Sequence, residues 1–430
     1  MESGSESMLS IDADGLTGSL MAIESFPDAR AILNGPGGCR NYHSFLSELH
    51  YPRPMVRDEP TFQEQYFFGQ SRIPCTYLDE EDYIRGAIDK VEDLIGVVRD
   101  KGDTLSVIIN SPGAALIGDD IGGAIVRNGL SGKMLSLEDV LVSTPVSSSY
   151  DATVRSIIAS LDISPADRVS QTVNLLGMSI LNKGWRDDVM ELRRILTQMG
   201  VKILSTPGAG STVSKITDSV KASCNIVVSP ELGLRTAELY KERYGIPYII
   251  PSDGAPVGFK AVRNWIEQVA KATGSDPIGA TLSLSSRRVE ACRLLTRFQF
   301  HTTLPKGATF AIKADSSMAL PLTEFLMNYL GMIPVAVRVN PGEYLPMAER
   351  LRSLLEESGF GGAWDRDITH DRADIVLADG HSVRLLKRMG ACQGGVDLGL
   401  PSLDRFDFIP RPLMGPQGTM HILDEIINSL

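Results

Sequence analysis

Short apolar runs alternate with longer amphipathic segments along most of this chain. Runs of four to eight residues, apolar and mostly β-branched, predict strands at 31–34, 105–110, 169–176, 201–205, 225–229, 308–313, 335–339 and 374–377. Between them, apolar residues recur every three or four positions, which predicts helices at 82–100, 187–199, 262–273, 320–330 and 347–357. Because the strand segments are apolar almost throughout, the pattern predicts an α/β fold with parallel sheets covered on both faces by helices.

The alternation of strands and helices divides the chain into three doubly wound, Rossmann-like domains. We place the boundaries near residues 165 and 300, which gives domains at 17–165, 166–300 and 301–430. Residues 1–16 come before the first domain, and we expect a disordered lead-in there because the segment begins acidic and rich in Ser and Gly. It has neither the basic start nor the apolar centre of a secretory signal.

Composition narrows the class of protein. The chain has 430 residues, of which 43% are hydrophobic and 22% charged, as in an ordinary soluble globular protein. A formal net charge of −11 argues against a nucleic-acid partner, and no apolar run approaches the roughly 20 residues that span a bilayer. Five widely spaced cysteines do not form a disulfide framework, so we expect a cytoplasmic protein with free thiols.

Several predicted strands end in turns rich in Gly, Ser and Asp. These turns are at 110–113, 205–211, 314–317 and 378–382. In open α/β sheets, ligands bind at the carboxyl ends of the strands, so these turns are candidate site loops. None of them has the spacing of a P-loop or of a dinucleotide-binding fingerprint. We therefore expect that the chain binds neither ATP nor NAD itself.

Two cysteines lie in loop-forming contexts suited to metal binding. Cys39 ends the segment Gly-Pro-Gly-Gly-Cys at 35–39, where glycines such as Gly38 permit close approach to a metal centre. Cys75 follows Pro74 and precedes an acidic helix start at 79–82. Two thiolates are too few for a [4Fe–4S] cluster, which takes four, unless a two-fold axis or a partner chain supplies the rest. The alternative is a pair of buried, inert thiols.

The other candidate residues have simpler explanations than metal binding. We expect Cys224 and Cys292 to be packing residues, and the pair Asp119 and Asp120 to cap a helix. His43 is close enough in sequence to Cys39 to form a hydrogen bond near it. The remaining candidates are Cys392 in a glycine-rich loop and a basic helix face, either solvated or anion-binding, formed by Arg287, Arg288, Arg293 and Arg297.

A colinear series of motifs resembles the nitrogenase component 1 superfamily. That superfamily contains the molybdenum–iron protein chains, their cofactor-assembly scaffolds, and the dark-operative protochlorophyllide and chlorophyllide reductases. The similar segments extend over nearly the whole chain after residue 17: 35–39 with Tyr42, 75–82 with Gly86, 116–121, 173–177, 244–248 with 256–258, and 411–418.

The resemblance implies a particular set of cofactors. Three Rossmann-like domains would surround a central cavity, and Cys39 and Cys75, with Gly38 beside them, would hold a [4Fe–4S] cluster shared with the same residues of a dimer mate. The family's third cluster cysteine falls at Pro112, so no P-cluster is expected. The histidine that holds the family's catalytic cofactor falls near Met414, so no iron–molybdenum cofactor and no dinitrogen reduction are expected either.

The resemblance also implies a role. The chain would be the electron-accepting component of a nitrogenase-like reductase, and a separate ATP-hydrolysing iron–sulfur reductase homodimer would dock over the dimer axis. The substrate would be a small organic molecule such as a tetrapyrrole, with His381 as a proton donor in the cavity. The dimer partner is either a second copy or a sister component-1-like chain. Two alternatives remain: a metallocofactor assembly scaffold or carrier of the same fold, and a cluster-free protein that only binds a small molecule.

Overall fold

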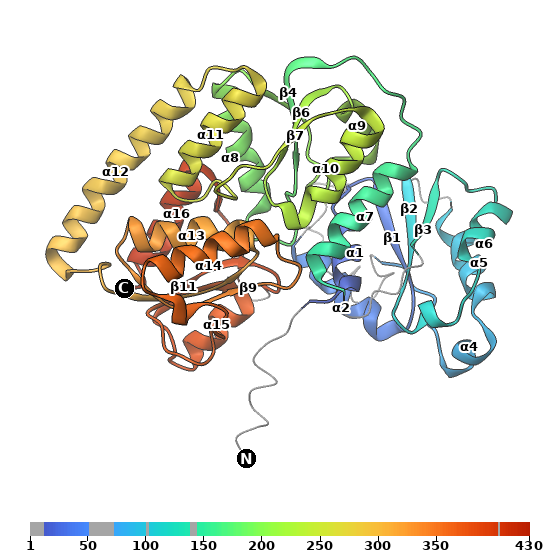
Figure 1. The fold of residues 1–430 in the computed structure, drawn as a ribbon. Coiled ribbons are helices and arrows are strands. Elements are labelled where there is room, and N and C mark those ends of the chain that lie inside the picture. The colour runs from blue at the N-terminus through green and yellow to red at the C-terminus, as the bar shows by residue number, and fades with distance from the viewer. Residues whose placement is uncertain (1–12, 51–72, 100–102, 138–143, 403–404) are drawn as a thin grey trace. The chain divides into compact units, whose positions relative to one another are not determined.

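The structure is a computed structural model that describes residues 13–50, 73–99, 103–137, 144–402 and 405–430. The chain forms two compact units, one of residues 13–165 with 207–218 and the other of residues 166–206 with 219–430. The described strands lie in three parallel sheets flanked by helices, one in the first unit and two in the second (Figure 1). The α/β fold with parallel sheets that the hydrophobic pattern predicts is confirmed. Residues 1–12 of the expected lead-in lie outside the described residues.

The first unit is built on a three-stranded sheet in the order β1-β2-β3. Its strands are β1 (Ala29–Asn34), β2 (Leu105–Asn110) and β3 (Met134–Leu137). Its helices are α1 (Gly15–Glu24), α2 (Gly37–His50), α4 (Glu80–Arg85), α5 (Ile88–Val98), α6 (Ile121–Arg127), α7 (Val146–Ser160) and α9 (Val213–Ser219). Asp14 caps α1 by accepting the backbone N–H of Thr17.

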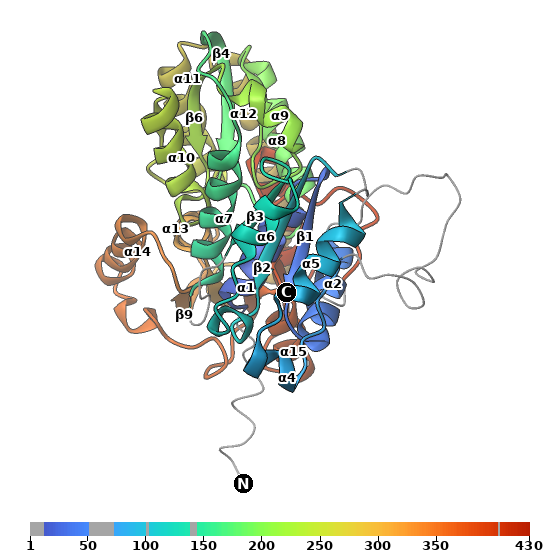
Figure 2. The same ribbon diagram turned by 90° about the vertical axis from the view of Figure 1, so that its right-hand side faces the viewer.

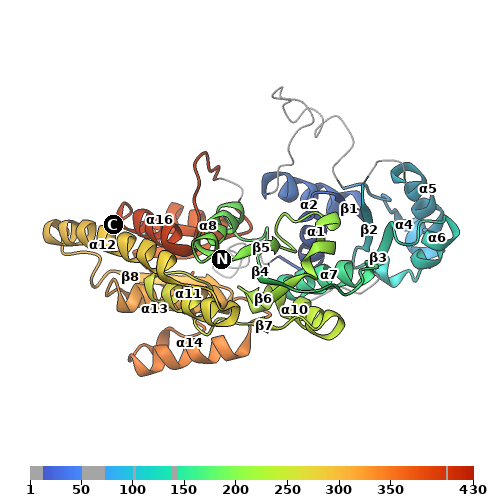
Figure 3. The same ribbon diagram turned by 90° about the horizontal axis from the view of Figure 1, so that it is seen from above.

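Both faces of this sheet are buried, which explains why its strands are apolar. All six residues of β2 are buried. On one face, Val91 and Ile95 of α5 and Ile121 of α6 form a core cluster with Ile32 and Ile108 of the sheet. Helices α1 and α7 pack against each other and contact the sheet, and the two rotated views show them on the side opposite α5 (Figures 2 and 3).

The second unit contains two four-stranded parallel sheets, in the orders β5-β4-β6-β7 and β11-β10-β8-β9. The strands of the first are β4 (Val169–Leu176), β5 (Lys202–Ser205), β6 (Ala222–Val227) and β7 (Tyr248–Ile249). Those of the second are β8 (Thr309–Ala314), β9 (Ile333–Val339), β10 (Ile375–Asp379) and β11 (Gly394–Gly399). Each order places consecutive strands on either side of an earlier one, as in doubly wound folds.

Eight longer helices of the second unit cover these sheets. They are α8 (Trp185–Gln198), α10 (Pro230–Tyr244), α11 (Phe259–Thr273), α12 (Ile278–Thr302), α13 (Ser316–Asn328), α14 (Leu345–Glu357), α15 (Gly380–Arg388) and α16 (Gly415–Ile427). Helix α10 contacts β4 and β6, whereas α13 contacts β8 and β9 and α15 contacts β10 and β11. Helix α16 contacts β11 as well as α8, α11 and α12, so it joins the two sheets within this unit.

Local details differ from the pattern-based prediction. The single helix expected at 82–100 is two helices, α4 and α5, because Gly86 between them has a φ of +93°, which interrupts the helix. Three strands, β3, β7 and β11, were not predicted. Within the described part of the chain, no helix has the length and apolar content needed to cross a membrane.

Candidate functional site

Residues 74–78 run beside the carboxyl end of β1 and bring Cys75 there. Cys75 forms a parallel bridge with Leu33. The backbone N–H of Leu33 donates to the Pro74 carbonyl at 2.9 Å, and the N–H of Thr76 donates to the Leu33 carbonyl at 3.1 Å. The N–H of Leu78 then bonds to the Gly35 carbonyl at 3.1 Å. This backbone pairing fixes Cys75 beside the turn that leads from β1 into α2.

Cys39 lies at the start of α2, on the other side of the same turn. The sequence suggested a cysteine on a loop ahead of a helix, but α2 begins at Gly37, so Cys39 is already in its first turn. That position places the thiol near the positive end of the helix dipole, which favours a thiolate. A side chain at Gly37 would have its Cβ 3.0 Å from the Tyr77 ring, so this glycine permits the close approach of the two segments.

A small polar network holds the end of β1 to the cysteine-bearing segment. The Thr76 hydroxyl donates to Asn34 Oδ1 at 2.8 Å and accepts the backbone N–H of Gly35 at 3.0 Å. Asn34 in turn donates through Nδ2 to Asn110 Oδ1 on β2 at 2.8 Å. These side chains are buried, so their mutual hydrogen bonds are needed to offset desolvation. The network makes the positions of Cys39 and Cys75 depend on the sheet itself.

The two thiols interact electrostatically. Burial raises the pKa of Cys75 to about 11; the nearby Cys39 also raises this pKa, whereas Arg40 lowers it. Burial raises the pKa of Cys39 as well, and the Asp14 carboxylate adds to that shift. Cys75 Sγ donates to the Gly35 carbonyl at 3.0 Å and accepts the Tyr77 N–H at 3.4 Å. Without a metal, both groups are therefore thiols at neutral pH, and a metal ion would have to displace their protons.

His43 fixes the first turn of α2. Burial lowers the pKa of His43, so its ring is neutral at physiological pH. Its Nδ1 lies 2.6 Å from the carbonyl oxygen of Cys39, which can only accept, so Nδ1 carries the proton. Nε2 lies 3.1 Å from the Thr17 hydroxyl, which itself donates to Asp14 Oδ1 at 2.9 Å. The expectation that His43 forms a hydrogen bond beside Cys39 is confirmed, and the bond is to the Cys39 backbone.

Arg40 and Tyr77 join the two cysteine segments at the surface of this corner. The guanidinium carbon of Arg40 lies 4.8 Å from the centroid of the Tyr77 ring, in a cation–π contact. Sequence reasoning missed both residues, as it missed Asn34 and Thr76. A polar residue ending a buried strand, as Asn34 ends β1, was the signal that could have identified the network.

The other three cysteines and His381 belong to the second unit. His381 belongs to the second unit, in the first turn of α15, where its backbone N–H donates to the Pro401 carbonyl at 2.9 Å. Cys224 is buried in β6, as expected of a packing residue. Cys392 is buried in an apolar cluster of the last sheet. Cys292 was expected to pack but is exposed on α12, so that prediction is wrong.

The expected helix cap at 119–120 is confirmed. Asp120 caps α6 by accepting the Gly123 N–H at 2.8 Å. Asp119 accepts the Ala87 N–H at 2.9 Å, so it ties the start of α5 to the segment before α6. Both carboxylates therefore have structural roles, and neither needs a catalytic role to explain its position.

Comparison with known proteins identifies the family. The family model of nitrogenase component 1 type oxidoreductases matches residues 15–430. This chain belongs to that family. Its sequence identity to individual members is low, but the alignments extend over nearly the whole chain. The resemblance inferred from the motifs is confirmed. The chain is an oxidoreductase of the nitrogenase component 1 type.

The nitrogenase molybdenum–iron protein beta chain of Methanococcus maripaludis is 23% identical over 460 aligned residues, covering 96% of this chain and 92% of the relative. A light-independent protochlorophyllide reductase component from Methylobacterium radiotolerans is 26% identical, with 91% of this chain and 75% of the relative covered. A solved structure described as nitrogenase Cp1 at pH 6.5 matches with a TM-score of 0.77 at 16% identity, covering 97% of this chain and 92% of that one. That structure shows that the fold is shared.

The structure describes the two positions at which the resemblance places the family's missing ligands. Pro112, where the resemblance places the third cluster cysteine, lies in the turn after β2 and has no donor atom for a metal in its side chain. Met414, where the resemblance places the cofactor histidine, is fully buried just before α16. The backbone N–H of Met414 donates to Asp188 Oδ1 at 2.8 Å.

Proposed function

We propose that Cys39 and Cys75 hold one [4Fe–4S] cluster together with the same two residues of a partner subunit. The observation that carries this proposal is the backbone pairing of residues 74–78 with β1, which places Cys75 beside the turn that leads to Cys39. Such a cluster takes four thiolates. In the described residues, no three Cys, His, Asp or Glu side chains gather as a metal site. The proposal therefore assigns the other two ligands to a second chain.

The donor chemistry of the corner fits such a cluster. Two thiols that influence each other's charge share one corner with the Arg40 cation and the N-terminus of α2. Both positive groups stabilise thiolates over thiols. The Tyr77 N–H, 3.4 Å from Cys75 Sγ, is the kind of donor that stabilises a metal-bound sulfur and tunes its reduction potential.

The remaining residues of the corner would position the ligands and exclude water. Cys75 is 6% exposed, so the protein shields one side of the site from solvent. His43 holds the carbonyl of Cys39 and thereby fixes the first turn of α2. When bound, the cluster supplies one-electron transfer, and the protein contributes a fixed, partly dry setting for it.

We further propose that the electrons come from a separate ATP-hydrolysing iron–sulfur reductase homodimer. The sequence supports this division of labour because it contains no phosphate-binding loop of its own.

The substrate would be a small organic molecule. A tetrapyrrole is the leading candidate, because the relatives include a protochlorophyllide reductase component and the resemblance places the family's cofactor histidine near Met414. His381 is our candidate proton donor, and a cytoplasmic location suits an oxygen-sensitive cluster.

Spectroscopy of anaerobically purified protein tests the proposal. We expect a brown protein whose visible absorption bleaches with dithionite and which then gives the EPR signal of a reduced [4Fe–4S] cluster. Cys39→Ala and Cys75→Ala should both lose the absorption and the signal. Cys292→Ala is the matched control, because Cys292 is exposed on α12 in the other unit, and it should retain both.

The outcome separates the proposal from its alternatives. A colourless wild-type protein after anaerobic purification would favour a cluster-free member that only binds a small molecule. Unchanged spectra in both cysteine variants would show that these residues are not the ligands. A cluster or metallocofactor that passes intact to an acceptor protein, with no turnover of a tetrapyrrole, would favour the assembly scaffold or carrier.

A further inference from the structure

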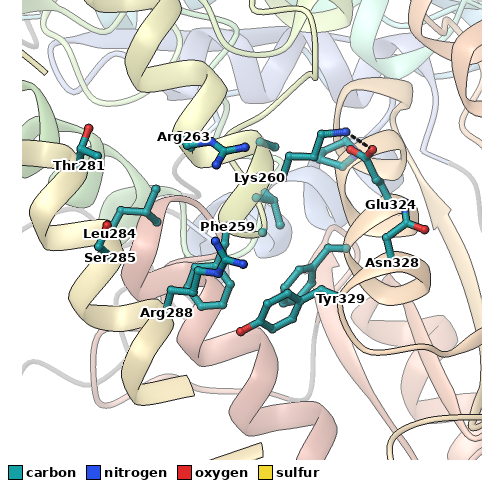
Figure 4. Close-up of a pocket in the computed structure, with 15 residues that line it drawn as sticks. Phe259, Lys260, Arg263, Thr281, Leu284, Ser285, Arg288, Glu324, Asn328 and Tyr329 are labelled. Carbon is teal, nitrogen blue, oxygen red and sulfur yellow. Dashed lines mark hydrogen bonds and ion pairs between the residues drawn. The ribbon is translucent and has the colours of Figure 1, made fainter. Parts of the chain in front are cut away.

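A cavity of about 340 Å³ lies between helices α11, α12 and the end of α13 in the second unit (Figure 4). Its size falls at the lower end of the range of small-molecule pockets, which is roughly 300–1,000 Å³. All of its lining residues belong to residues 219–430. The cysteine pair is in the other unit, so the cavity and the proposed cluster site have no residue in common.

Aromatic rings form the floor of the cavity. Phe325 and Tyr329 are stacked with an interplanar angle of 17° and centroids 5.2 Å apart. Phe259 meets Tyr329 edge-on at 5.1 Å and Phe325 at 6.0 Å. Phe259 and Phe325 are buried, whereas Tyr329 is half-buried and reaches the open side. A planar apolar group entering the cavity would therefore meet aromatic ring surface.

Cationic side chains surround this floor. Lys260 and Arg263 come from α11 and Arg288 comes from α12, and Figure 4 shows all three extending toward the space between the helices. Glu324 is the one carboxylate among the lining residues, and it pairs with Lys260. Arg263 has a long contact with Glu267, at 4.0 Å.

The charge of Arg288 is directed at the aromatic floor. Burial raises the pKa of Tyr329, and the guanidinium of Arg288 beside its hydroxyl partly opposes this shift. No carboxylate of the described residues pairs with Arg288. A chain with a net charge of −11 thus presents positive side chains at the mouth of an aromatic cavity. Arg288, which has no carboxylate partner among the described residues, and Arg263, whose carboxylate contact is long, are the side chains that attract an anionic ligand.

We infer that this cavity binds an aromatic carboxylate or a chemically similar organic anion. The planar body of the ligand lies against Phe325 and Tyr329, and its acidic group is bound by Arg263 and Arg288. Arg is well suited to this task because its planar guanidinium binds carboxylates in a bidentate manner and stacks on aromatic rings.

Two fluorescent probes of the same shape test the inference. 8-Anilinonaphthalene-1-sulfonate carries an acidic group, and N-phenyl-1-naphthylamine has the same ring system without it. Equilibrium titration of the full chain with each probe separates binding by charge from binding by the aromatic floor. We expect saturable binding of the sulfonate and weaker binding of the neutral amine.

Variants identify the residues responsible. Arg263→Gln and Arg288→Gln should each weaken sulfonate binding about tenfold and leave the neutral amine unchanged, because only the charge-assisted bonds are lost. Tyr329→Leu should weaken both probes. Arg287→Gln is the matched control: Arg287 neighbours Arg288 on α12 but does not line the cavity, and it pairs with Glu290 at 2.7 Å. It should bind both probes as the wild type does.

Other results overturn the inference. If the wild type does not bind the sulfonate saturably, or if Arg288→Gln binds it as tightly as Arg287→Gln does, the cavity is not an anion site. Equal losses for both probes in Arg288→Gln would show a packing role for this side chain. Thermal melting of each variant checks that the fold is intact. Cys39→Ala should bind both probes normally, so failure of the cluster proposal leaves this test unaffected.

Discussion

Thr76 illustrates how much of the candidate site depends on a single hydroxyl. Its oxygen accepts from the Gly35 N–H and donates to Asn34, and all three groups are buried between β1 and the segment that carries Cys75. Within the described residues, no other group donates a hydrogen bond to Asn34 Oδ1. The geometry of both cysteines therefore depends on a residue that carries no redox or acid–base chemistry.

Replacing that hydroxyl by a methyl group should be costly. Thr76→Val keeps the shape but leaves buried polar groups unpaired, so we expect the free energy of unfolding to fall by about 1–3 kcal/mol. Urea denaturation measures the change. Thr217→Val is the control, since the Thr217 hydroxyl bonds to the Ser214 carbonyl at an exposed position, and it should cost well under about 1 kcal/mol. Equal effects of the two substitutions would contradict the proposed network.

Asp188 gives a prediction about pH. It is fully buried, and burial raises its pKa to about 7, even though the N–H groups of Leu413 and Met414 donate to its Oδ1 and lower that value. An aspartate in the unfolded chain has a pKa of about 3.9, so the folded state binds the Asp188 proton more tightly. The stabilisation from protonated Asp188 is complete below about pH 3.9. It is lost as the pH rises through about 7.

The Asp188→Asn variant isolates this contribution. An asparagine oxygen can accept the same two N–H groups but does not titrate, so the variant should lose less stability than the wild type between about pH 4 and pH 7. Urea denaturation at several pH values gives the comparison. Parallel stability curves for the two proteins would show that Asp188 stays ionised in the fold.

At this scale, sequence reasoning could identify the chemistry-bearing residues but not their neighbours. Cys39 and Cys75 were identified by residue type and by the glycines and proline around them. Arg40 and Tyr77 were not, because their contact is between segments 37 positions apart and no short-range pattern predicts it. Cys292 was misassigned because the amphipathic pattern of α12 is weak, so the pattern does not tell which of its faces is buried.

At the scale of elements, glycines decide how closely helices approach each other. In α1, a Cβ on Gly18 would lie 2.2 Å from the carbonyl oxygen of Val146 at the start of α7. In α5, a Cβ on Gly96 would meet nothing within 4 Å. Both positions are helical and both belong to the first unit. They form a matched pair for one substitution.

The same substitution should have opposite effects at these two positions. Gly18→Ala forces α1 and α7 apart and should lower the free energy of unfolding by about 1–3 kcal/mol. Gly96→Ala gains helix propensity without a clash and should raise it by up to about 1 kcal/mol. Thermal and chemical denaturation measure both. A neutral Gly18→Ala variant would mean that α1 and α7 are not packed this closely.

The elements also show where pattern reasoning succeeds. Strand β2 was predicted because its sequence is mostly apolar, and all six of its residues are buried between the helices that cover the sheet. Strand β11, Gly394–Gly399, was missed because two adjacent glycines and an aspartate conceal its apolar residues. The break between α4 and α5 depends on the positive φ of Gly86, and glycine is also tolerated inside helices, so sequence alone left it undecided.

At the scale of the whole molecule, the alternation of strands and helices was enough to predict the fold class. Three parallel sheets were expected and three are present, with two of them in one compact unit. The division into three domains at 165 and 300 remains a prediction, as does the assembly. A single chain supplies two thiols at its candidate site, so the proposed cluster requires two more from a partner subunit. The ratio of clusters to subunits therefore tests the proposed assembly.

Native mass spectrometry of the anaerobically purified protein tests that stoichiometry most directly. We expect a dimer, or a complex with one sister chain, whose mass exceeds that of its polypeptides by a single [4Fe–4S] cluster. Cys39→Ala and Cys75→Ala should remove this added mass, and Cys292→Ala should keep it. A monomer that carries a complete cluster of its own, or an assembly whose cluster persists in both cysteine variants, would contradict the account.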